Sequence, residues 1–277
     1  MKSNPDISVI ITTYNRPESL TRAIRSVLLQ DFKNFEVIVV DDGSAEETGK
    51  AVRDLNDQRI VYVRNPKNLG GTKSLNVGLK EARGEYVCPL DDDDTWSDRE
   101  KLSKQWTFLE GHPEYVLVGT NVVVVEGKSR KEITRSSWPE DDAALRKIIF
   151  HENPFAHSSV MYRRKSAISV KGYDETLPRG KDYDLILKLG MVGRFAVLGA
   201  HGVEYCETPR EGVDLMRMRL EDAKATAGLV WRHRREYPGP YCASSVLLAR
   251  IMAFWILART PFLARLYRHS YKCNNYQ

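Results

Sequence analysis

The sequence predicts an α/β fold, in which a doubly wound and mostly parallel sheet is flanked by helices and followed by a C-terminal helical extension. Two observations support this prediction. Continuous apolar runs rich in β-branched residues, such as ISVIITT at 7–13 and FEVIVV at 35–40, are typical of strands buried on both faces. Up to Trp96 these runs alternate with segments of helical apolar spacing, and such alternation favours parallel strands joined by helices.

The first 96 residues contain four strand–helix units. Pro17 opens the first helix, because proline is favoured in the first helical turn, where its missing N–H costs nothing. The apolar residues of that helix recur at a spacing that places them on one side. The predicted elements are a strand at 7–13, a helix at 18–30, a strand at 35–40, a helix near 46–56, a strand at 59–63, a loop and helix at 70–82 and a strand at 85–90.

Beyond Trp96 the alternation is less regular. A helix at 98–110 precedes YVLVGTNVVVVEG at 115–127, which is typical of one strand or of two, with antiparallel pairing among the options. A helix is predicted from Asp182. Residues 220–236 have helical character, and an apolar stretch occupies 246–267. We therefore divide the chain into a domain over 1–215, with halves at about 1–96 and 97–215, and a basic, apolar helical tail over 216–277.

The composition, with 42% hydrophobic and 29% charged residues, is that of a folded protein. The net charge of +5 is concentrated in residues 217–277, which contain 11 Lys and Arg against 3 Asp and Glu. The remainder is nearly neutral, which argues against a nucleic-acid-binding domain. The four cysteines are scattered, so neither a zinc site nor a disulfide framework is predicted. The apolar run near the N-terminus is too short for a signal peptide, and we expect a cytoplasmic protein.

Polar side chains follow three of the predicted strands. TTYNR (12–16) ends the first strand, DDGS (41–44) the second and DDDD (91–94) the fourth. Ligands of open α/β sheets bind at the carboxyl ends of the strands, so these segments should share one crevice. An acidic crevice favours a hard divalent cation, Mg²⁺ or Mn²⁺, which normally also binds phosphate oxygens.

The aspartate run has two other possible interpretations. An EF-hand counted from Asp91 requires Gly at its sixth position and Glu at its twelfth, where this chain has Trp96 and Leu102. A helix N-cap suits Asp94 or Asp98 but does not account for four aspartates at a strand end. NLGGTK (68–73) matches no glycine-rich phosphate-binding loop, so a nucleotide would be held through a metal.

Five ordered segments resemble the successive blocks of family-2 glycosyltransferases. They cover about residues 6–200. The resemblance implies a GT-A-like fold, with a nucleotide-binding half at about 1–96 and an acceptor half at about 97–215. It also implies transfer of a sugar from a nucleotide donor with inversion at the anomeric carbon. The segments are SVIITTYNRPESLTRAIRSVLLQDFKNFEVIVVDDGSAEET, NPKNLGGTKSLNVGL, GEYVCPLDDDDTW, HSSVMYRR (157–164) and KDYDLILKLG (181–190).

The resemblance also implies roles for individual residues. Asp93 would ligate the metal, Mn²⁺ or Mg²⁺, and Asp182 would be the catalytic base. Tyr14 offers a stacking face, and Asp42 can accept a hydrogen bond from a base or a ribose. In a helix Asp184 points about 200° away from Asp182, so only one of the two can face the site. The residues expected to bind the donor are Thr12, Tyr14, Asn15, Asp42, Lys73, Asp91 and Asp92.

The chain departs from the family pattern at several positions. Lys181 stands where relatives have the glutamate of a Glu-Asp pair, and it would lower the pKa of the base or bind donor phosphate. Leu75 stands where many relatives carry arginine, a charge that Lys73 could replace. His201 and Arg210 are two candidates for a residue that reaches the metal or the diphosphate. His157 is interpreted as structural.

The sequence therefore predicts a metal-dependent inverting glycosyltransferase. We expect a nucleotide-sugar donor, with a UDP-sugar favoured, and a glycan or lipid-linked acceptor. A sugar-1-phosphate nucleotidyltransferase is an alternative, although it would require a glycine-rich loop after the first strand, and TTYNRPES has no glycine. A catalytically silent sugar-nucleotide-binding or scaffold protein is the other, supported by the departures at Lys181 and Leu75.

The tail allows two interpretations. Arginines interrupt its apolar stretch, and its longest uncharged run, 251–258, is far shorter than the roughly 20 residues of a membrane-spanning helix. Helical spacing places Arg250 and Arg268 on one face, Arg265 near it and Arg259 opposite. We expect either an interfacial segment resting on anionic lipid, at the inner face of the cell membrane, or a helix pair packed on the body or on another subunit.

Overall fold

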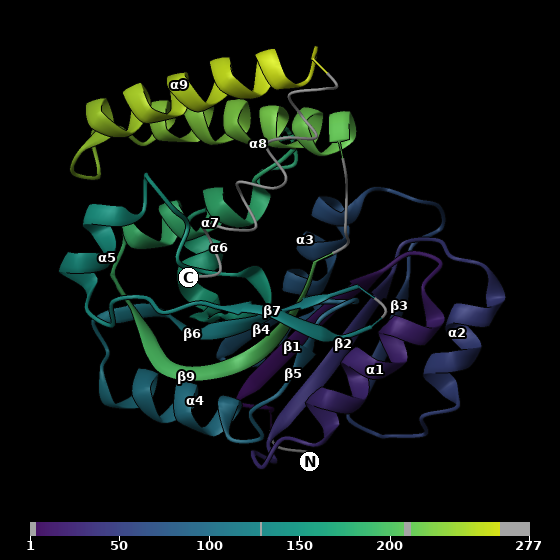
Figure 1. The fold of residues 1–277 in the computed structure, drawn as a ribbon. Coiled ribbons are helices and arrows are strands. Elements are labelled where there is room, and N and C mark those ends of the chain that lie inside the picture. Colours follow the sequence, from purple (N-terminus) through teal and green to yellow (C-terminus); the bar gives the residue numbers. More distant parts are fainter. Residues whose placement is uncertain (1–3, 128, 208–211, 261–277) are drawn as a thin grey trace.

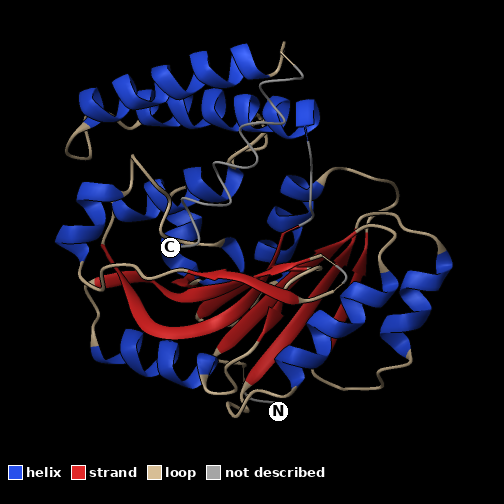
Figure 2. Cartoon of the chain, viewed as in Figure 1, coloured by secondary structure: helices blue, strands red, loops and turns tan. Residues whose placement is uncertain are grey.

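The computed structural model describes residues 4–127, 129–207 and 212–260. Its centre is one mixed sheet with helices on both faces, and a pair of long helices forms an additional layer on one side (Figures 1 and 2). The strand order is β3-β2-β1-β4-β8-β6-β9-β5, with β7 paired to β6. The predicted α/β class with a mostly parallel sheet and a C-terminal helical extension is thus confirmed.

The strands divide into a regular parallel half and a less regular second half. The strands are β1 (Ile7–Thr13), β2 (Phe35–Asp41), β3 (Ile60–Arg64), β4 (Tyr86–Asp91), β5 (Thr95–Trp96), β6 (Tyr115–Glu126), β7 (Lys131–Arg135), β8 (Met161–Arg163) and β9 (Arg194–Glu207).

The parallel half brings the three polar strand ends together. β1 lies between β2 and β4, with Thr12 opposite Val40 on one side and Asp91 on the other. Thr13 pairs with Asp41, the last residue of β2. Because all three strands run in the same direction, their carboxyl ends lie at one edge of the sheet, as the sequence predicts.

The second half is joined through β8, which is antiparallel to both β4 and β6. The segment at 115–127 forms one strand, β6, antiparallel to β7 and β8 but parallel to β9. β9 is a 14-residue strand that curves along β6, with register shifts near Thr120 and Asn121 (Figure 1). Its C-terminal part returns past β5, with Thr95 opposite Glu204.

The helices cover both faces of the sheet. α1 and α4 pack on the face that carries Val9 and Ile11, whereas α3, α5, α6 and α7 pack on the face that carries Ile10 (Figure 1). The helices are α1 (Pro17–Leu28), α2 (Glu46–Arg53), α3 (Gly71–Glu81), α4 (Lys101–Gly111), α5 (Asp142–Ile148), α6 (Arg164–Ser169), α7 (Lys181–Gly190), α8 (Gly212–Arg232) and α9 (Pro240–Leu257), with a 3₁₀ turn at His157–Ser159.

The predicted tail forms two packed helices. α8 lies over α7, and α9 lies over α8 as the outermost layer (Figure 1). Leu229 and Val230 of α8 and Leu247 of α9 join the core on the α3 and α7 side. Residues 261–267 of the predicted apolar stretch, with Arg265, and Arg268 beyond it lie outside the described residues. Within the described ranges, no helix has both the length and the apolar character needed to span a membrane.

Candidate active site

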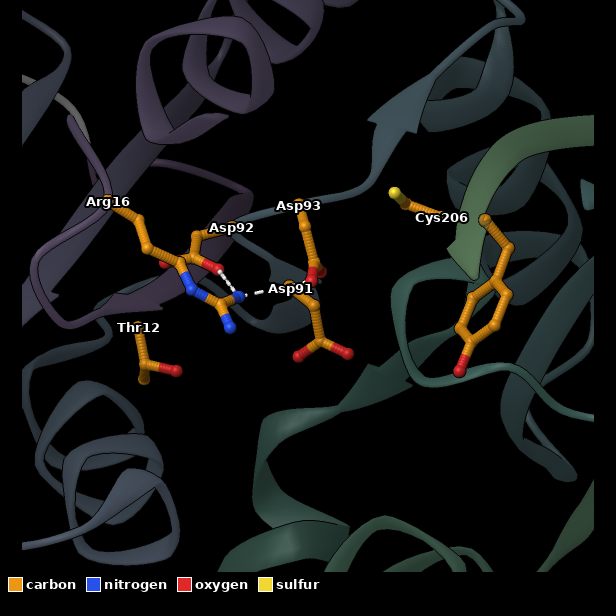
Figure 3. A pocket seen from close by; sticks show the side chains of 7 residues that line it. Thr12, Arg16, Asp91, Asp92, Asp93 and Cys206 are labelled. Atoms are coloured by element: carbon orange, nitrogen blue, oxygen red, sulfur yellow. Dashed lines mark hydrogen bonds and ion pairs between the residues drawn. The ribbon is translucent and has the colours of Figure 1, made fainter. Parts of the chain in front are cut away.

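An acidic cavity of about 290 Å³ opens at the carboxyl ends of β1 and β4 (Figure 3). Three segments far apart in the sequence form its walls, because the end of β9 curves back towards the aspartate run and the end of β1. The sequence analysis anticipated the aspartates and Thr12 but not the residues from β9, since the register of HGVEYCETPREG could not be read from the sequence. The lining residues are Thr12, Arg16, Asp91, Asp92, Asp93, Tyr205 and Cys206.

Arg16 joins two of the aspartates. Its Nη1 lies 3.1 Å from Asp92 Oδ1 and 3.1 Å from Asp93 Oδ2, and the guanidinium remains half-exposed (Figure 3). Thr13 donates a 2.7 Å hydrogen bond to the other oxygen of Asp92. Sequence reasoning missed Arg16, although it immediately follows the residues expected to bind the donor. A cation therefore already bridges the carboxylates of Asp92 and Asp93.

The electrostatics of the cavity favour a further positive charge. Burial raises the pKa of Asp93, the neighbouring charge of Asp91 raises it further, and Arg16 opposes both. Burial also raises the pKa of Asp92, against the hydrogen bond from Thr13 and the charge of Arg16. Several carboxylates held this close are stabilised by a cation, and oxygen donors suit Mg²⁺ or Mn²⁺.

The residues present fit a metal bound with few protein ligands. Among the described residues, no three His, Cys, Asp or Glu side chains are grouped to hold an ion by themselves. Mg²⁺ is usually bound by one or two carboxylates together with substrate phosphates, so a divalent cation here would share its coordination with a bound diphosphate. Asp93 is the aspartate best suited to this role, because it lines the cavity and is less buried than Asp92.

Asp91 is anchored by a buried hydrogen-bonded chain. His157 Nδ1 lies 3.1 Å from Asp91 Oδ1, and His157 Nε2 lies 3.0 Å from the hydroxyl of Tyr173. That hydroxyl is 3.2 Å from the hydroxyl of Tyr162. A carboxylate only accepts, so Nδ1 of His157 donates the hydrogen bond to Asp91. The expected structural histidine thus holds a residue of the cavity.

The pKa of Asp91 is shifted in the opposite direction from the pKa values of the three aspartates that follow it. Burial alone would raise its pKa, but the charge and hydrogen bond of His157, with help from Lys181 and Arg16, hold the pKa below the ordinary value. Asp91 is therefore the aspartate most firmly kept as a carboxylate. Its influence also contributes to the raised pKa of Asp93.

Asp94 does not cap a helix. It is buried, with Oδ1 accepting a 2.7 Å hydrogen bond from the backbone N–H of Cys206 and Oδ2 accepting one from the hydroxyl of Ser158. Burial, followed by the charge of Asp91, raises its pKa well above the ordinary value. Asp98 is nearer the expected capping role, because its side chain accepts from the N–H of Glu100 at 2.9 Å, just before α4. The fourth aspartate thus ties β9 to the cavity.

The residues predicted to bind the donor base lie beside the acidic cavity. Tyr14 is 47% exposed, so its ring is open to a ligand. Asn15 adopts a left-handed backbone with φ of 55°, which asparagine tolerates, and its side chain accepts from the N–H of Ala45 at 2.8 Å. It thereby holds the loop after β1 against the loop after β2.

Asp42 is more constrained than the sequence suggested. Its carboxylate accepts 2.8 Å hydrogen bonds from the N–H groups of Leu69 and Gly70 and a 2.9 Å bond from Asn65. Burial opposes the charge of Asp42, but these hydrogen bonds outweigh it and lower the pKa. Asp42 therefore holds the loop before α3 as an ionised carboxylate, with only 4% of the residue exposed.

A second cavity, of about 350 Å³, contains the predicted base. α7 begins after Gly180, whose left-handed φ of 72° suits glycine, and its first turn carries Lys181 and Asp182. Asp182 is half-buried, and its carboxylate has no hydrogen bond or ion pair with any described residue. The cavity is lined by Gly71, Thr72, Leu177, Pro178, Arg179, Gly180, Lys181, Asp182 and Asp222.

The two cavities are electrostatically connected. Burial and the charges of Asp94, Asp91 and Asp182 raise the pKa of Tyr205, which lines the first cavity, so Asp182 in the second lies within reach of it. Lys181 in turn helps to lower the pKa of Asp91. A Cβ on Gly71 would lie 3.1 Å from Lys181 Nζ, which places the ammonium group at the start of α3.

Asp184 points away from both cavities, as helix geometry predicts. It is completely buried, with Oδ2 2.9 Å from Lys188 Nζ and Oδ1 3.2 Å from His233 Nε2 and 3.3 Å from Arg232 Nη1. Arg232 is the last residue of α8, and His233 follows it directly. Asp184 therefore joins α7 to the α8 layer.

The remaining predicted residues are placed as follows. Lys73 is exposed on α3 and lines neither cavity, so the structure does not bring it to the site. Leu75 is buried in the core, which explains why this position is apolar here. His201 lies on β9 with Nε2 3.1 Å from the carbonyl of Ser136, outside both cavities. Arg210 lies outside the described residues.

The sequence of this chain is similar to those of known proteins. The family model described as "Glycosyl transferase family 2" matches residues 8–170. The amylovoran biosynthesis glycosyltransferase AmsE of Erwinia amylovora is 33% identical over 190 residues, 67% of this chain and 70% of its own length. The GalNAc(5)-diNAcBac-PP-undecaprenol beta-1,3-glucosyltransferase of Campylobacter jejuni is 33% identical over 174 residues, 62% of this chain and 55% of its own.

Solved structures agree at the level of the fold. The mannosyltransferase PcManGT of Pyrobaculum calidifontis, in complex with GDP-Man and Mn²⁺, superposes with a TM-score of 0.64 at 20% identity, covering 95% of this chain and 74% of its own. TarS 1–349 of S. aureus in complex with UDP-GlcNAc gives a TM-score of 0.63 at 25% identity, covering 90% and 72%. Both the fold and the matched residues lead to one conclusion: this chain is a glycosyltransferase and belongs to glycosyl transferase family 2.

Proposed function

We propose that the protein is a metal-dependent, inverting glycosyltransferase that moves a sugar from a nucleotide-sugar to a glycan or lipid-linked acceptor. One observation carries this proposal. The start of α7 brings a half-buried carboxylate, Asp182, within electrostatic reach of the acidic cavity formed by Asp91, Asp92 and Asp93. A metal-binding aspartate and a general base on opposite sides of one substrate are the two groups that such a reaction requires.

The donor nucleotide would lie along the carboxyl ends of β1 and β2. Tyr14 would stack on the base, while Thr12, Asn15 and Asp42 would form the wall next to the base and the ribose. Asp91 or Asp92 would accept hydrogen bonds from the ribose or the transferred sugar. A UDP-sugar is favoured because TarS, which was solved with UDP-GlcNAc, is 25% identical to this chain. PcManGT, which was solved with GDP-Man, is 20% identical. Lys73 could approach the donor only if its exposed side chain reorients.

Asp93 would hold the divalent cation, Mn²⁺ or Mg²⁺. When bound, such an ion neutralises the charge that develops on the nucleoside diphosphate leaving group. Arg16 now contacts both Asp92 and Asp93, so it would move towards the diphosphate or share the carboxylates with the ion. In both arrangements, positive charge is placed where the leaving group becomes negative.

Asp182 would accept the proton of the acceptor hydroxyl as that oxygen attacks the anomeric carbon from the side opposite the diphosphate. The bond to the diphosphate oxygen breaks as the new glycosidic bond forms, and the configuration inverts. Lys181, whose ammonium group lies beside the start of α3 and near Asp91, would bind a donor phosphate. Residues 1–96 would thus bind the nucleotide, and residues 97–215 would orient the acceptor.

A lipid-linked acceptor is favoured by the name of the Campylobacter jejuni relative, which specifies an undecaprenol diphosphate acceptor. Such an acceptor is confined to a bilayer. We therefore propose that the protein works in peripheral contact with a membrane, through the helical tail that follows the catalytic domain.

Release of nucleoside diphosphate from a panel of sugar nucleotides, with Mn²⁺ and with EDTA, tests this function. We expect one donor to be turned over with Mn²⁺ and not with EDTA, and NMR should show the inverted anomer in the product. Asp93→Asn should reduce turnover at least ~100-fold because the carboxylate that binds the metal is lost. Asp54→Asn, at an exposed aspartate of the body, is the matched control. Undiminished turnover in EDTA, or an active Asp93→Asn enzyme, would contradict the metal assignment.

A further inference from the structure

The outer side of α9 carries a stripe of exposed large apolar side chains. Leu248 is 60% exposed, Met252 59%, Trp255 49% and Ile256 46%. Their spacing of three, four and seven residues places them on one side of the helix. α9 is the outermost layer of the molecule, so this stripe is not covered by any described element (Figure 1).

The opposite side of α9 already has its packing partner. Ala243 and Leu247 are buried in the core that includes α8, and Arg250 Nη1 lies 3.4 Å from the carbonyl of His151 in the body. Burial of the inner side is enough to dock the helix. The apolar residues of the outer side therefore do not serve the fold, and a soluble surface would normally carry polar residues there.

The charge of the sequence after α8 favours an anionic partner. After Glu236 the sequence has no aspartate or glutamate, whereas it has five Lys and Arg residues, of which Arg250 and Arg259 are among the described residues. Two residues beyond the end of α9, the guanidinium of Arg259 lies 3.8 Å from the centre of the Trp255 ring. Just after α8, the guanidinium of Arg234 lies 4.2 Å from the centre of the Trp231 ring. Arginine paired with tryptophan suits a boundary that is apolar on one side and anionic on the other.

We propose that the outer side of α9, formed by Leu248, Met252, Trp255 and Ile256, docks on the surface of an anionic bilayer together with Arg259 just beyond the helix. The apolar side chains would enter the boundary between headgroups and acyl chains, and Arg259 would pair with lipid phosphates. The inference extends the membrane contact proposed above by naming the face. It also changes the expected geometry, because Arg250 is turned to the body and Arg259 belongs to the docking face.

Flotation of the full chain with vesicles tests the face directly. The probes are vesicles of phosphatidylglycerol with phosphatidylcholine, and of phosphatidylcholine alone. We expect the wild type to float with the anionic vesicles, and less in high salt. The triple substitution Leu248→Gln, Met252→Gln, Trp255→Gln should reduce the floated fraction by roughly tenfold or more. Arg259→Glu should reduce it to a smaller degree.

The matched control replaces three equally exposed apolar residues of the body, Leu29→Gln, Ile168→Gln and Met191→Gln, which are 58%, 52% and 51% exposed. This variant should float like the wild type, and all variants should keep the wild-type unfolding temperature. No flotation of the wild type, or equal flotation of the α9 variant, would overturn the proposal. So would a wild-type dimer that the α9 substitutions convert to monomer without any flotation, because the face would then bind a second copy.

The same samples separate docking from catalysis. Turnover with a soluble acceptor should be unchanged in the α9 variant, because none of its three substituted residues lines either cavity. Flotation that depends on the stripe in a protein without transfer activity would support the docking inference and contradict the proposed function.

Discussion

At the scale of single residues, the hydrogen-bonded chain from Tyr162 through Tyr173 and His157 to Asp91 gives the cavity its order. His157 is the only one of these residues that contacts both a tyrosine and the aspartate. Groups that orient a ligand-binding carboxylate typically change affinity or activity 10–100-fold when they are removed. His157 should therefore act as a positioning residue.

Substitution of His157 tests this role. His157→Phe removes the N–H that Asp91 accepts and should lower kcat/KM for the donor at least ~10-fold. His157→Asn can still donate from a position close to Nδ1 and should recover a large part of that loss. Tyr173→Phe, which leaves the link to Asp91 intact, is the control. Equal impairment of the Phe and Asn variants, with equally lowered unfolding temperatures, would reduce His157 to a structural residue.

The site residues differ in how far the sequence could reveal them. Thr12, Asp91 and Asp93 follow strands whose pattern is clear, so their meeting at one edge was predictable. Arg16 could have been suspected from its position beside them, but its pairing with Asp92 depends on side-chain geometry that no spacing rule contains. Tyr205 was not predictable, because the register of β9 shifts three times along β6, and these shifts affect which of its residues reach the cavity.

At the scale of elements, α7 directs two nearby aspartates to opposite sides of the helix. Asp182 lies in the second cavity, while Asp184 is buried against α8. Arg232, the last residue of α8, also lies 2.7 Å from Asp174 in the segment before α7. Two carboxylates, Asp174 and Asp184, and the apolar core thus hold α8 against the body.

The Asp174 contact has a defined pH dependence. Hydrogen bonds from Thr176 and Arg232 lower the pKa of Asp174 from 3.8 to about 2. Because the folded-state pKa is lowered, the stabilisation is present above pH ~4 and disappears as the pH falls towards 2. Asp174→Asn should therefore lower the free energy of unfolding by about 1 kcal/mol at pH 7, an amount discounted for solvent exposure.

Urea unfolding of wild type and Asp174→Asn at pH 7 and at progressively lower pH measures this effect. The difference between the two proteins should shrink as the pH falls from 5 to 3. A difference that stays constant over this range would show that the loss does not come from the ionised carboxylate.

The elements themselves show where sequence patterns suffice. The strands of the parallel half were predicted to within about one residue, because buried parallel strands form continuous apolar runs. Helical character was predicted over 220–236, whereas α8 begins at Gly212, and the predicted apolar stretch starts at 246, whereas α9 begins at Pro240. Gly239 stands at the N-cap of α9 and has no side chain that could accept from the first turn, so the usual polar cap does not mark this start.

At the scale of the whole molecule, both cavities combine residues from the two halves of the chain. In the first cavity the parallel half supplies Asp91, Asp92 and Asp93, and the second half supplies the end of β9. In the second cavity the start of α3 lies beside Asp182 of the second half. β8, antiparallel to both β4 and β6, joins the halves into one sheet. The sheet therefore sets the separation between the proposed metal site and the proposed base, and α8 holds α7 in place from the far side.

The most direct test of this account compares the turnover of Asp182→Asn with that of Asp184→Asn, using the donor and metal identified in the panel. Asp182→Asn should lower turnover at least ~100-fold with donor affinity nearly unchanged, because only the general base is lost. Asp184→Asn should leave turnover within a few fold and instead lower the free energy of unfolding by about 1–3 kcal/mol, because buried hydrogen bonds and ion pairs are lost. The reverse pattern, or full turnover in both variants, would contradict the claim that Asp182 is the base.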